Sequence, residues 1–316
     1  MKILVTGSSG FIGSALIKHL SHIEGFSVVG LVRSKNNIIT NDDCEYRVGD
    51  LASSNIKNIN LNDIDIIIHT AGRAHITNET SSQPIAEFRR VNTYGTIDLA
   101  RLAKKAGVKR FIFLSSIKVN GESTKIGVPF SINSRETPCD AYGLSKLEAE
   151  VGLREVSDET GLEVTIIRPP LVYGPGVKGN LRSLIKILSA NIPLPLASIK
   201  NNRRSMIALD NLINFISLCA QHPKAINKTF FVSDNNDLST YCLLKLLGDS
   251  IGKSVILFSV PVFILKFISK VFKMETQFQR LTGSLQVDIS YTCNELDWKP
   301  LITVEQGIKR LNNEAN

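Results

Sequence analysis

Tyr142 and Lys146 stand four residues apart in a Tyr-Gly-Leu-Ser-Lys stretch, which places both side chains on one face of a predicted helix. A tyrosine is a poor base near neutral pH because its ordinary pKa is about 10. A nearby ammonium group favours the phenolate and lowers that pKa, so the pair could exchange a proton with a hydroxyl or ketone. Ser116, at the end of the preceding predicted strand, could donate a hydrogen bond to the same oxygen. Taken alone, a Tyr/Lys pair of this spacing is also common on helices without any function.

A glycine-rich turn links the first predicted strand to the first predicted helix. Gly7, Gly10 and Gly13 follow the apolar run 2–6 at intervals of three. Glycine permits the tight bend and the close approach of a pyrophosphate, and the helix that begins at Phe11 directs free N–H groups at such an anion. The spacing is a variant of the dinucleotide-binding fingerprint, although by itself it also fits an ordinary glycine turn.

The first half of the chain alternates strand patterns with helix patterns. The predicted strands cover residues 2–6, 26–32, 44–48, 64–68, 111–114 and 164–168. The two predicted long helices cover residues 84–106 and 142–160. This alternation predicts an α/β fold with a Rossmann-type, doubly wound parallel sheet, whose ligands bind at the carboxyl ends of the strands.

The regular alternation of strand and helix patterns ends in the second half, where short strands are predicted near 205–208 and 229–232. We therefore predict a dinucleotide-binding domain at 1–172 and a smaller substrate-binding lobe at 173–316. The segment near 225–235 is a candidate for return to the first domain.

Composition and charge narrow the classes of partner. The chain has 316 residues, and its net charge of +8 comes from dispersed Lys and Arg rather than a basic run. This pattern argues against a nucleic-acid partner and suits an anionic small substrate. The five cysteines have neither metal-ligand nor redox spacing, and the chain begins directly with its first strand. We therefore expect reduced cysteines, no bound metal and a cytoplasmic protein.

The motifs together resemble the extended short-chain dehydrogenase/reductases of the nucleotide-sugar epimerase/dehydratase group, from Met1 to about Leu311. The resemblance rests on Thr6–Gly13, Asp50–Leu51, His69–Gly72, Val91–Thr96, Leu114–Ser116, the Tyr142/Lys146 pair, Arg168–Gly176 and Leu296–Pro300. It implies NAD or NADP as cofactor, a UDP-sugar substrate and a homodimer formed through the two long helices. The segments Ser115–Gly121 and Gly283–Asp288 are similar to members from bacterial surface-polysaccharide pathways, including lipopolysaccharide pathways.

The resemblance also implies roles for individual residues. The implied cofactor-binding residues are Gly7, Gly10, Phe11, Ile12, Gly13, Arg33, Asp50, Leu51, Ala71, Gly72 and Lys146. The implied catalytic residues are Ser116, Tyr142 and Lys146. The implied substrate-binding residues are Ser116, Asn180, Arg203 and Arg280. Asn180 and Arg203 would hold the sugar-nucleotide diphosphate, and a guanidinium suits that task because it forms two parallel bonds to phosphate oxygens. A solvated surface arginine is an equally good interpretation of Arg203.

Two departures from the family pattern bear on the reaction. Members that use NAD commonly end the second strand with an acidic residue, whereas this chain has Arg33 and Ser34. An arginine there can accommodate the 2′-phosphate of NADP, or it can stack on adenine without selecting between cofactors. Dehydratases of the family carry an Asp-Glu pair after the active-site hydroxyl residue, where this chain has Ile117 and Lys118. Water elimination would then lack its proton donor and acceptor.

Three functions remain open from the sequence. The first is a nucleotide-sugar 4-epimerase that acts on a UDP-hexose or UDP-N-acetylhexosamine through a 4-keto intermediate. The second is an NADPH-dependent 4-ketoreductase that makes a UDP-linked deoxy-amino sugar, which Arg33 favours. The third is a non-catalytic dinucleotide-binding regulator, which the presence of Ser116, Tyr142 and Lys146 disfavours.

The apolar stretch from Val255 to Phe272 resembles a membrane segment but is interrupted by Pro261 and two lysines, so we expect no transmembrane helix. Either an interfacial helix or a helix packed on the substrate lobe fits its pattern. The face expected to be apolar comprises Phe258, Val262, Leu265, Ile268, Ser269 and Phe272. We expect this face to pack on the lobe, which needs such a helix for its core. We also expect the protein not to float with anionic liposomes at physiological salt.

Overall fold

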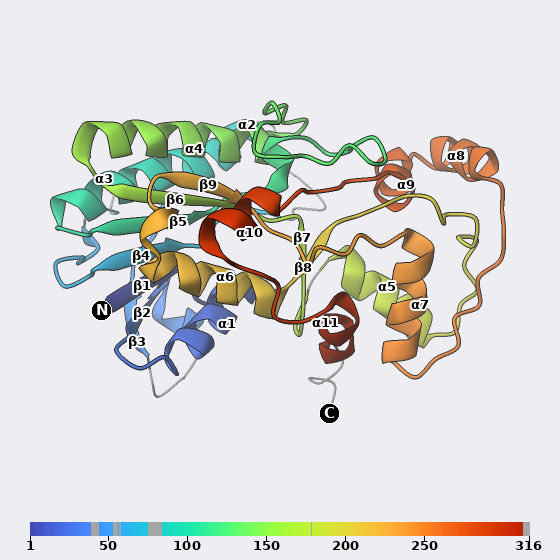
Figure 1. Ribbon diagram of the computed structural model, residues 1–316, viewed down its shortest axis with the longest axis horizontal. Coiled ribbons are helices and arrows are strands. Elements are labelled where there is room, and N and C mark those ends of the chain that lie inside the picture. Colours follow the sequence, from blue (N-terminus) through green and yellow to red (C-terminus); the bar gives the residue numbers. More distant parts are fainter. Residues whose placement is uncertain (39–43, 53–55, 57, 75–83, 178, 312–316) are drawn as a thin grey trace.

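A seven-stranded parallel sheet forms the centre of the larger part of the molecule (Figure 1). The computed structural model describes residues 1–38, 44–52, 56, 58–74, 84–177 and 179–311. The sheet order is β3-β2-β1-β4-β5-β6-β9. Its strands are β1 Lys2–Thr6, β2 Ser27–Val32, β3 Glu45–Val48, β4 Ile66–His69, β5 Arg110–Leu114, β6 Glu163–Arg168 and β9 Lys228–Phe231. The predicted doubly wound Rossmann-type fold is confirmed. Successive strands are added on one side of β1 up to β3 and on the other side from β4 onward, so the switch point of the sheet lies between β1 and β4.

Helices cover both faces of this sheet, which explains why its strands are apolar on both sides. On one face lie α1 (Phe11–Leu20) and α6 (Leu209–Gln221), and on the other lie α3 (Gly95–Lys105) and α4 (Ala141–Thr160) (Figure 1). The buried side chains divide into two clusters that correspond to these faces. Ligand-binding residues are therefore left to the strand ends and the loops that follow them.

The helix predicted over 84–106 is not continuous. It consists of α2 (Pro84–Phe88), a π-helical segment (Arg89–Tyr94) and α3. The wider π turn directs the buried Asn92 and Thr93 at α4, where Thr93 Oγ1 donates to the carbonyl of Ser145 at 2.9 Å. Such segments occur frequently at functional sites, and the apolar periodicity of the sequence does not distinguish them from regular helix.

The smaller lobe is built around a two-stranded parallel sheet of β7 (Leu171–Tyr173) and β8 (Met206–Ala208). Its helices, with α10 beside β9, are α5 Asn180–Ser189, α7 Thr240–Ser250, α8 Val262–Val271, α9 Glu275–Thr282, α10 Ser290–Leu296 and α11 Val304–Arg310. The buried Asp234 joins the two parts, because it accepts hydrogen bonds from the Tyr173 hydroxyl at 2.7 Å and from the Ala208 N–H at 2.9 Å. The division of the chain at residue 172 stays a prediction.

The predicted packing of α8 on the lobe is wrong for most of its apolar face. Leu265 is half-buried and Ser269 is buried. The other four residues expected to pack, Phe258, Val262, Ile268 and Phe272, are exposed. The lobe core forms instead between α5, α7 and α11, so the lobe is filled without the outer half of α8. Within the described ranges, no helix is long and apolar enough to cross a bilayer.

A buried ionic network fixes the end of β5 against α4 and β6. Arg168 Nε donates to Glu150 at 2.9 Å, and the guanidinium also bonds Asn120 at 3.0 Å and Glu136 at 3.0 Å. Glu150 accepts a further bond from the Ser115 hydroxyl at 2.5 Å. Both charged side chains of the central pair are almost fully enclosed. Because the two charges compensate each other, each is tolerated only while its partner is present.

We expect Glu150→Ala to lower the free energy of unfolding by about 3–5 kcal/mol, since it leaves the Arg168 charge buried without its main partner. The matched control is Glu148→Ala on the same helix, which removes the more exposed pair with Arg89 and should cost no more than about 1 kcal/mol. Urea unfolding of both variants measures the difference. Equal losses in the two variants would contradict this account of the network.

Candidate active site

The predicted cofactor-binding residues lie along one edge of the sheet. Gly7, Arg33 and Asp50 come just after β1, β2 and β3, and Ala71 follows β4 by two residues. These four strands are neighbours, and the register aligns Thr6 of β1 with Leu31 of β2 and His69 of β4. The carboxyl ends of the strands therefore bring together groups that are up to 64 residues apart in the chain.

The glycine turn is required by close packing as well as by the backbone. Gly7 has φ +68°, and a Cβ there would lie 2.8 Å from the backbone nitrogen of Ala71. A Cβ on Gly13 would lie 2.1 Å from the carbonyl oxygen of Gly7. The turn can thus press against the loop after β4 only because these positions lack side chains.

The N-terminus of α1 fits a phosphate group. Gly10 is its N-cap residue and supplies no capping side chain, and the first turn contains no acidic residue. The first N–H groups of a helix have no partner within the helix, so those of Phe11, Ile12 and Gly13 are available to an anion. The residues present therefore fit the pyrophosphate of a dinucleotide.

Gly72, Asn92 and Lys146 meet beyond the end of β4. A Cβ on Gly72 would lie 3.3 Å from Asn92 Oδ1 and 3.4 Å from Lys146 Nζ. Lys146 Nζ donates to the carbonyl of Leu114 at 2.9 Å and lies 4.5 Å from the centre of the Phe113 ring. The structure therefore brings together Gly72 and Lys146, which the sequence assigns to the same part of the cofactor.

Ser116 and Tyr142 also lie close together, near enough for the Ser116 hydroxyl to affect the pKa of Tyr142. Burial raises the pKa of Tyr142 to about 12, the Ser116 hydroxyl opposes part of that rise, and the charge of Asp140 adds to it. Burial lowers the pKa of Lys146 to about 8, against the opposing charge of Glu150. The expectation that Lys146 lowers the pKa of Tyr142 is wrong for this structure, because desolvation dominates and the ammonium is bonded to the Leu114 carbonyl.

The N-terminus of α4 is held by a small charged cluster beside Ser116. Asp140 caps the helix by accepting from the Gly143 N–H at 2.7 Å. Lys118 donates to Asp140 and, at 2.8 Å, to Glu122. Ile117, the other residue at the dehydratase position, is buried in the core. The two nearby carboxylates thus share a lysine, which leaves neither free as the proton donor or acceptor for water elimination.

The sequence missed two residues that position the site. The buried His69 bonds the hydroxyls of Thr6 at 2.7 Å and Thr96 at 2.9 Å, and burial lowers its pKa to about 3, so the ring is neutral. Asn92 accepts from the Arg73 N–H at 2.8 Å and donates to Ser145 Oγ at 3.0 Å. Both stand in family motifs, but a motif by itself does not reveal which neighbour a side chain bonds.

The predicted substrate arginines are arranged differently from each other. The Arg203 guanidinium donates to the carbonyls of Lys200 and Asn202, both at 3.0 Å. Its neighbour Arg204, which the sequence missed, is half-buried, and burial together with the charge of Arg280 lowers its pKa. Arg204 and Arg280 therefore form a pair of like charges in the smaller lobe. Asn180 begins α5, and its side chain lies outside the described residues.

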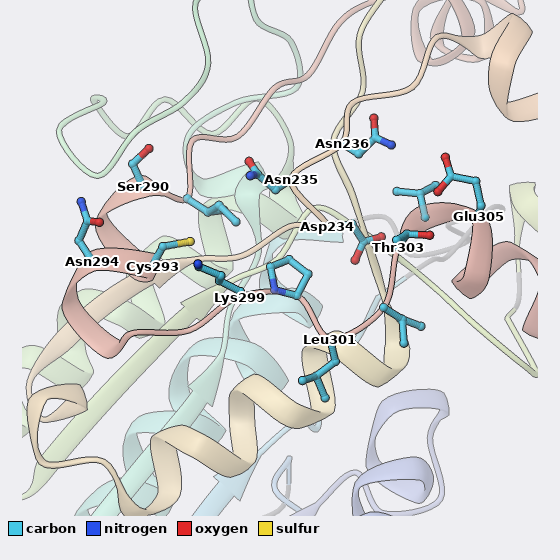
Figure 2. Close-up of a pocket in the computed structure, with 14 residues that line it drawn as sticks. Asp234, Asn235, Asn236, Ser290, Cys293, Asn294, Lys299, Leu301, Thr303 and Glu305 are labelled. Atoms are coloured by element: carbon cyan, nitrogen blue, oxygen red, sulfur yellow. The ribbon is translucent and has the colours of Figure 1, made fainter.

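A pocket of about 660 Å³ lies elsewhere in the molecule (Figure 2). Its lining consists of residues 234–236 and of part of the segment 289–305, and includes Asn235, Lys299 and Glu305. None of the predicted site residues lines this pocket. Over the ranges the structure describes, no three His, Cys, Asp or Glu side chains gather as metal ligands would. The candidate site is therefore argued from the strand-end geometry rather than from this pocket.

Comparisons with known proteins identify relatives of this chain. The chain is 43% identical to a UDP-glucose 4-epimerase of Vibrio cholerae over 308 residues, covering 98% of this chain and 93% of that protein. It is 26% identical, over 80% of this chain and 73% of the relative, to the N-acetyl-alpha-D-glucosaminyl-diphospho-ditrans,octacis-undecaprenol 4-epimerase of Escherichia coli O157:H7.

A solved UDP-glucuronic acid 4-epimerase from Bacillus cereus, in complex with NAD, has the same fold, with a TM-score of 0.78 at 21% identity over 98% of this chain and 97% of that one. The family model described as "NAD dependent epimerase/dehydratase family" matches residues 3–232. The protein is accordingly an enzyme of the extended short-chain dehydrogenase/reductases that uses NAD or NADP, and it belongs to the NAD dependent epimerase/dehydratase family.

Proposed function

We propose that the protein is a 4-epimerase of a UDP-hexose or UDP-N-acetylhexosamine and acts through a transient 4-keto sugar. The observation that carries the proposal is the proximity of Ser116 and Tyr142 beside the Gly72–Lys146 pair, beyond the carboxyl ends of β4 and β5. In this arrangement, two hydroxyl side chains that can both bond one sugar oxygen lie next to the predicted dinucleotide-binding residues. The name of the Vibrio cholerae relative supports the same reaction.

In this proposal, Tyr142 and Ser116 both contact the C4 oxygen of the sugar. Tyr142 removes the hydroxyl proton as C4 is oxidised and returns a proton when the ketone is reduced from the opposite face. Bound NAD or NADP would supply the hydride acceptor for the first step and, in its reduced form, the hydride donor for the second. Lys146, in its ammonium form, binds the ribose beside Gly72. In the structure the ammonium donates to the Leu114 carbonyl, and in this proposal it turns to the phenolate of Tyr142 while the proton is transferred.

The nucleotide end of the substrate is assigned to the smaller lobe. Arg204 and Arg280 present two positive charges there that repel each other until an anion lies between them. A diphosphate fits because each guanidinium forms charge-assisted bonds to phosphate oxygens. Arg204 joins Asn180, Arg203 and Arg280 as a proposed substrate-binding residue.

A homodimer formed through α3 and α4 is the proposed assembly. The two helices pack on each other at one face of the sheet (Figure 1). Val151 of α4, and Tyr94 next to α3, are exposed on these elements, as expected of residues that a second copy covers.

The proposed reaction is tested by incubating the purified protein separately with UDP-glucose and UDP-N-acetylglucosamine and following C4 epimers by NMR. We expect epimers to form without net consumption of NADPH. Stoichiometric oxidation of NADPH with a UDP-4-keto sugar, and no epimer from either substrate, would assign the 4-ketoreductase reaction instead. Turnover of only a lipid-linked sugar diphosphate would place the substrate with that of the Escherichia coli relative.

We expect Tyr142→Phe to retain cofactor binding and lose about 10²–10⁴-fold in turnover, because the ring packing on Phe88 survives and the titrating oxygen does not. Tyr94→Phe, which removes an exposed hydroxyl, is the control and should keep full turnover. Steady-state kinetics and cofactor titration measure the two quantities. More than about a tenth of wild-type turnover in Tyr142→Phe would remove Tyr142 from this role.

Arg33 is exposed after β2. If its guanidinium binds the 2′-phosphate, the protein should bind NADP(H) more tightly than NAD(H). Arg33→Asp should then shift the ratio of dissociation constants toward NAD(H) by about tenfold or more, since a hydrogen bond to a charged group contributes about 1.5–3 kcal/mol. Lys35→Asp makes the same charge change two residues further on and should leave the ratio unaltered. Wild-type binding of NAD that equals or exceeds binding of NADP would instead favour stacking of Arg33 on adenine.

Cofactor affinity should fall as the pH rises through about 8. The pKa of Lys146 is lowered to about 8 in the protein, so the ammonium that binds the ribose is lost above that pH. Lys146→Met should bind the cofactor more weakly and without this pH dependence. Isothermal titration between pH 7 and pH 10 would detect it, and parallel pH profiles for the two proteins would show that another group is responsible.

A further inference from the structure

The exposed apolar surface of this protein is concentrated on α8 and the segments on either side of it. Twenty large hydrophobic residues are exposed in the described parts of the chain, and ten of them fall between Ile256 and Met274. Soluble monomers rarely expose a contiguous apolar patch beyond a few hundred Å² unless it binds something. The stretch includes all of α8, which lies at the outer end of the smaller lobe (Figure 1).

The most exposed side chains of α8 form a stripe that faces away from the protein. Phe263, Phe267 and Val271 follow each other at intervals of four, and they are 73%, 68% and 61% exposed. On the opposite side, Leu265 is half-buried and Ser269 is buried. The helix is thus attached through a narrow inner edge and presents two aromatic rings outward.

Positive charges border this stripe. Lys266 and Lys270 are exposed on α8, one position before Phe267 and Val271, and Lys273 follows the helix. Over the described residues, none of the three forms an ion pair, although 14 such pairs occur elsewhere. Glu275 is the one acidic residue between positions 250 and 287. The surface around the stripe is therefore both apolar and basic.

We propose that α8 is an interfacial helix that docks the protein on an anionic lipid surface. Phe263, Phe267 and Val271 enter the boundary between headgroups and acyl chains, while Lys266, Lys270 and Lys273 contact anionic headgroups. This reverses the expectation that the stretch packs on its own lobe. The proposal rests on exposure and charge at α8 and does not depend on the reaction assigned to the active site.

A second copy of the chain is a poorer occupant of the same face. In a two-fold dimer the same patch meets itself, so the three lysines of one copy would approach those of the other with Glu275 as the one nearby acidic residue of each copy. A lipid surface that carries negative charge satisfies the apolar stripe and the lysines together.

Docking in this way would hold the smaller lobe beside the lipid surface. α8 packs against α9, which carries Arg280 of the proposed diphosphate site. The two helices lie together at the same end of the molecule (Figure 1). The proposed anion-binding side chains would then be close to the headgroup layer rather than on the far side of the protein.

The test is co-flotation of the full chain with phosphatidylcholine vesicles that contain or lack phosphatidylglycerol. We expect the protein to float with the phosphatidylglycerol vesicles, and the bound fraction to fall as salt rises, because salt screens the lysine contribution. The double variant F263S/F267S should reduce the apparent affinity about tenfold or more, since each phenyl ring loses its burial. The double variant K266Q/K270Q should weaken the preference for phosphatidylglycerol, because only Lys273 of the three lysines is left.

Control variants elsewhere on the surface test whether the loss of vesicle binding is specific to α8. I192S/L301S removes two other exposed apolar side chains, and K105Q/K109Q removes two other exposed lysines. Both controls should float like the wild type. In addition, F267W should show a blue-shifted emission with vesicles, against the constant background of the buried Trp298.

Absence of flotation with phosphatidylglycerol vesicles at low salt would overturn the proposal, as would equal binding by the wild type and F263S/F267S. A concentration-dependent dimer in light scattering that F263S/F267S abolishes, without vesicle binding by the wild type, would assign the face to a second copy. Either result leaves the epimerase assay unaffected, so the docking proposal and the proposed reaction fail separately.

Discussion

The carboxylate of Glu150 is the point on which the geometry of the candidate site depends. It is enclosed between β5, α4 and β6, where it accepts hydrogen bonds from Ser115 and Arg168. Ser115 immediately precedes Ser116, and Glu150 lies one helical turn after Lys146. One buried ion pair thus sets the distance between the strand that carries the serine and the helix that carries the tyrosine and the lysine. Such a pair contributes little to stability in itself, but it makes alternative packings of these elements costly.

Burial also determines the protonation of the site. The pKa of Tyr142 is raised and that of Lys146 is lowered, in each case because the charged form loses contact with water. Both groups are therefore neutral over a wider range of pH than in water. A site of this kind responds strongly to any charge brought into it, because the surrounding protein screens that charge weakly. The acid-base chemistry proposed for Tyr142 accordingly requires the Lys146 ammonium, which bonds the Leu114 carbonyl in the structure, to turn to the phenolate during proton transfer.

The tightly packed part of the molecule is distinct from the part that contributes little to a core. The sheet residues next to the cofactor cradle are fully buried, and the glycine turn leaves no room even for a methyl group at Gly13. The smaller lobe forms its own core around α5, α7 and α11, against which α8 packs mainly through Leu265, so the outer side of α8 is not needed for that core. Because the outer side of α8 is not needed for the core, it can carry exposed aromatic rings. An apolar helical pattern therefore leads to burial only where the neighbouring elements leave a core to be filled.

The sequence by itself determined the sheet, the glycine turn and the identity of the catalytic candidates, because apolar periodicity and short motifs act over a few residues. Thr6, His69 and Ser116 could be assigned to strand ends, and the doubly wound order followed from the alternation of strands and helices. Only the tertiary structure decided which side chains meet across long separations. It placed Lys146 on the Leu114 carbonyl rather than on Tyr142, brought the charges of Arg204 and Arg280 near each other, and turned Phe263 and Phe267 outward. Each of these outcomes depends on desolvation or on competition for space between elements far apart in the chain, and a local pattern carries no information about either.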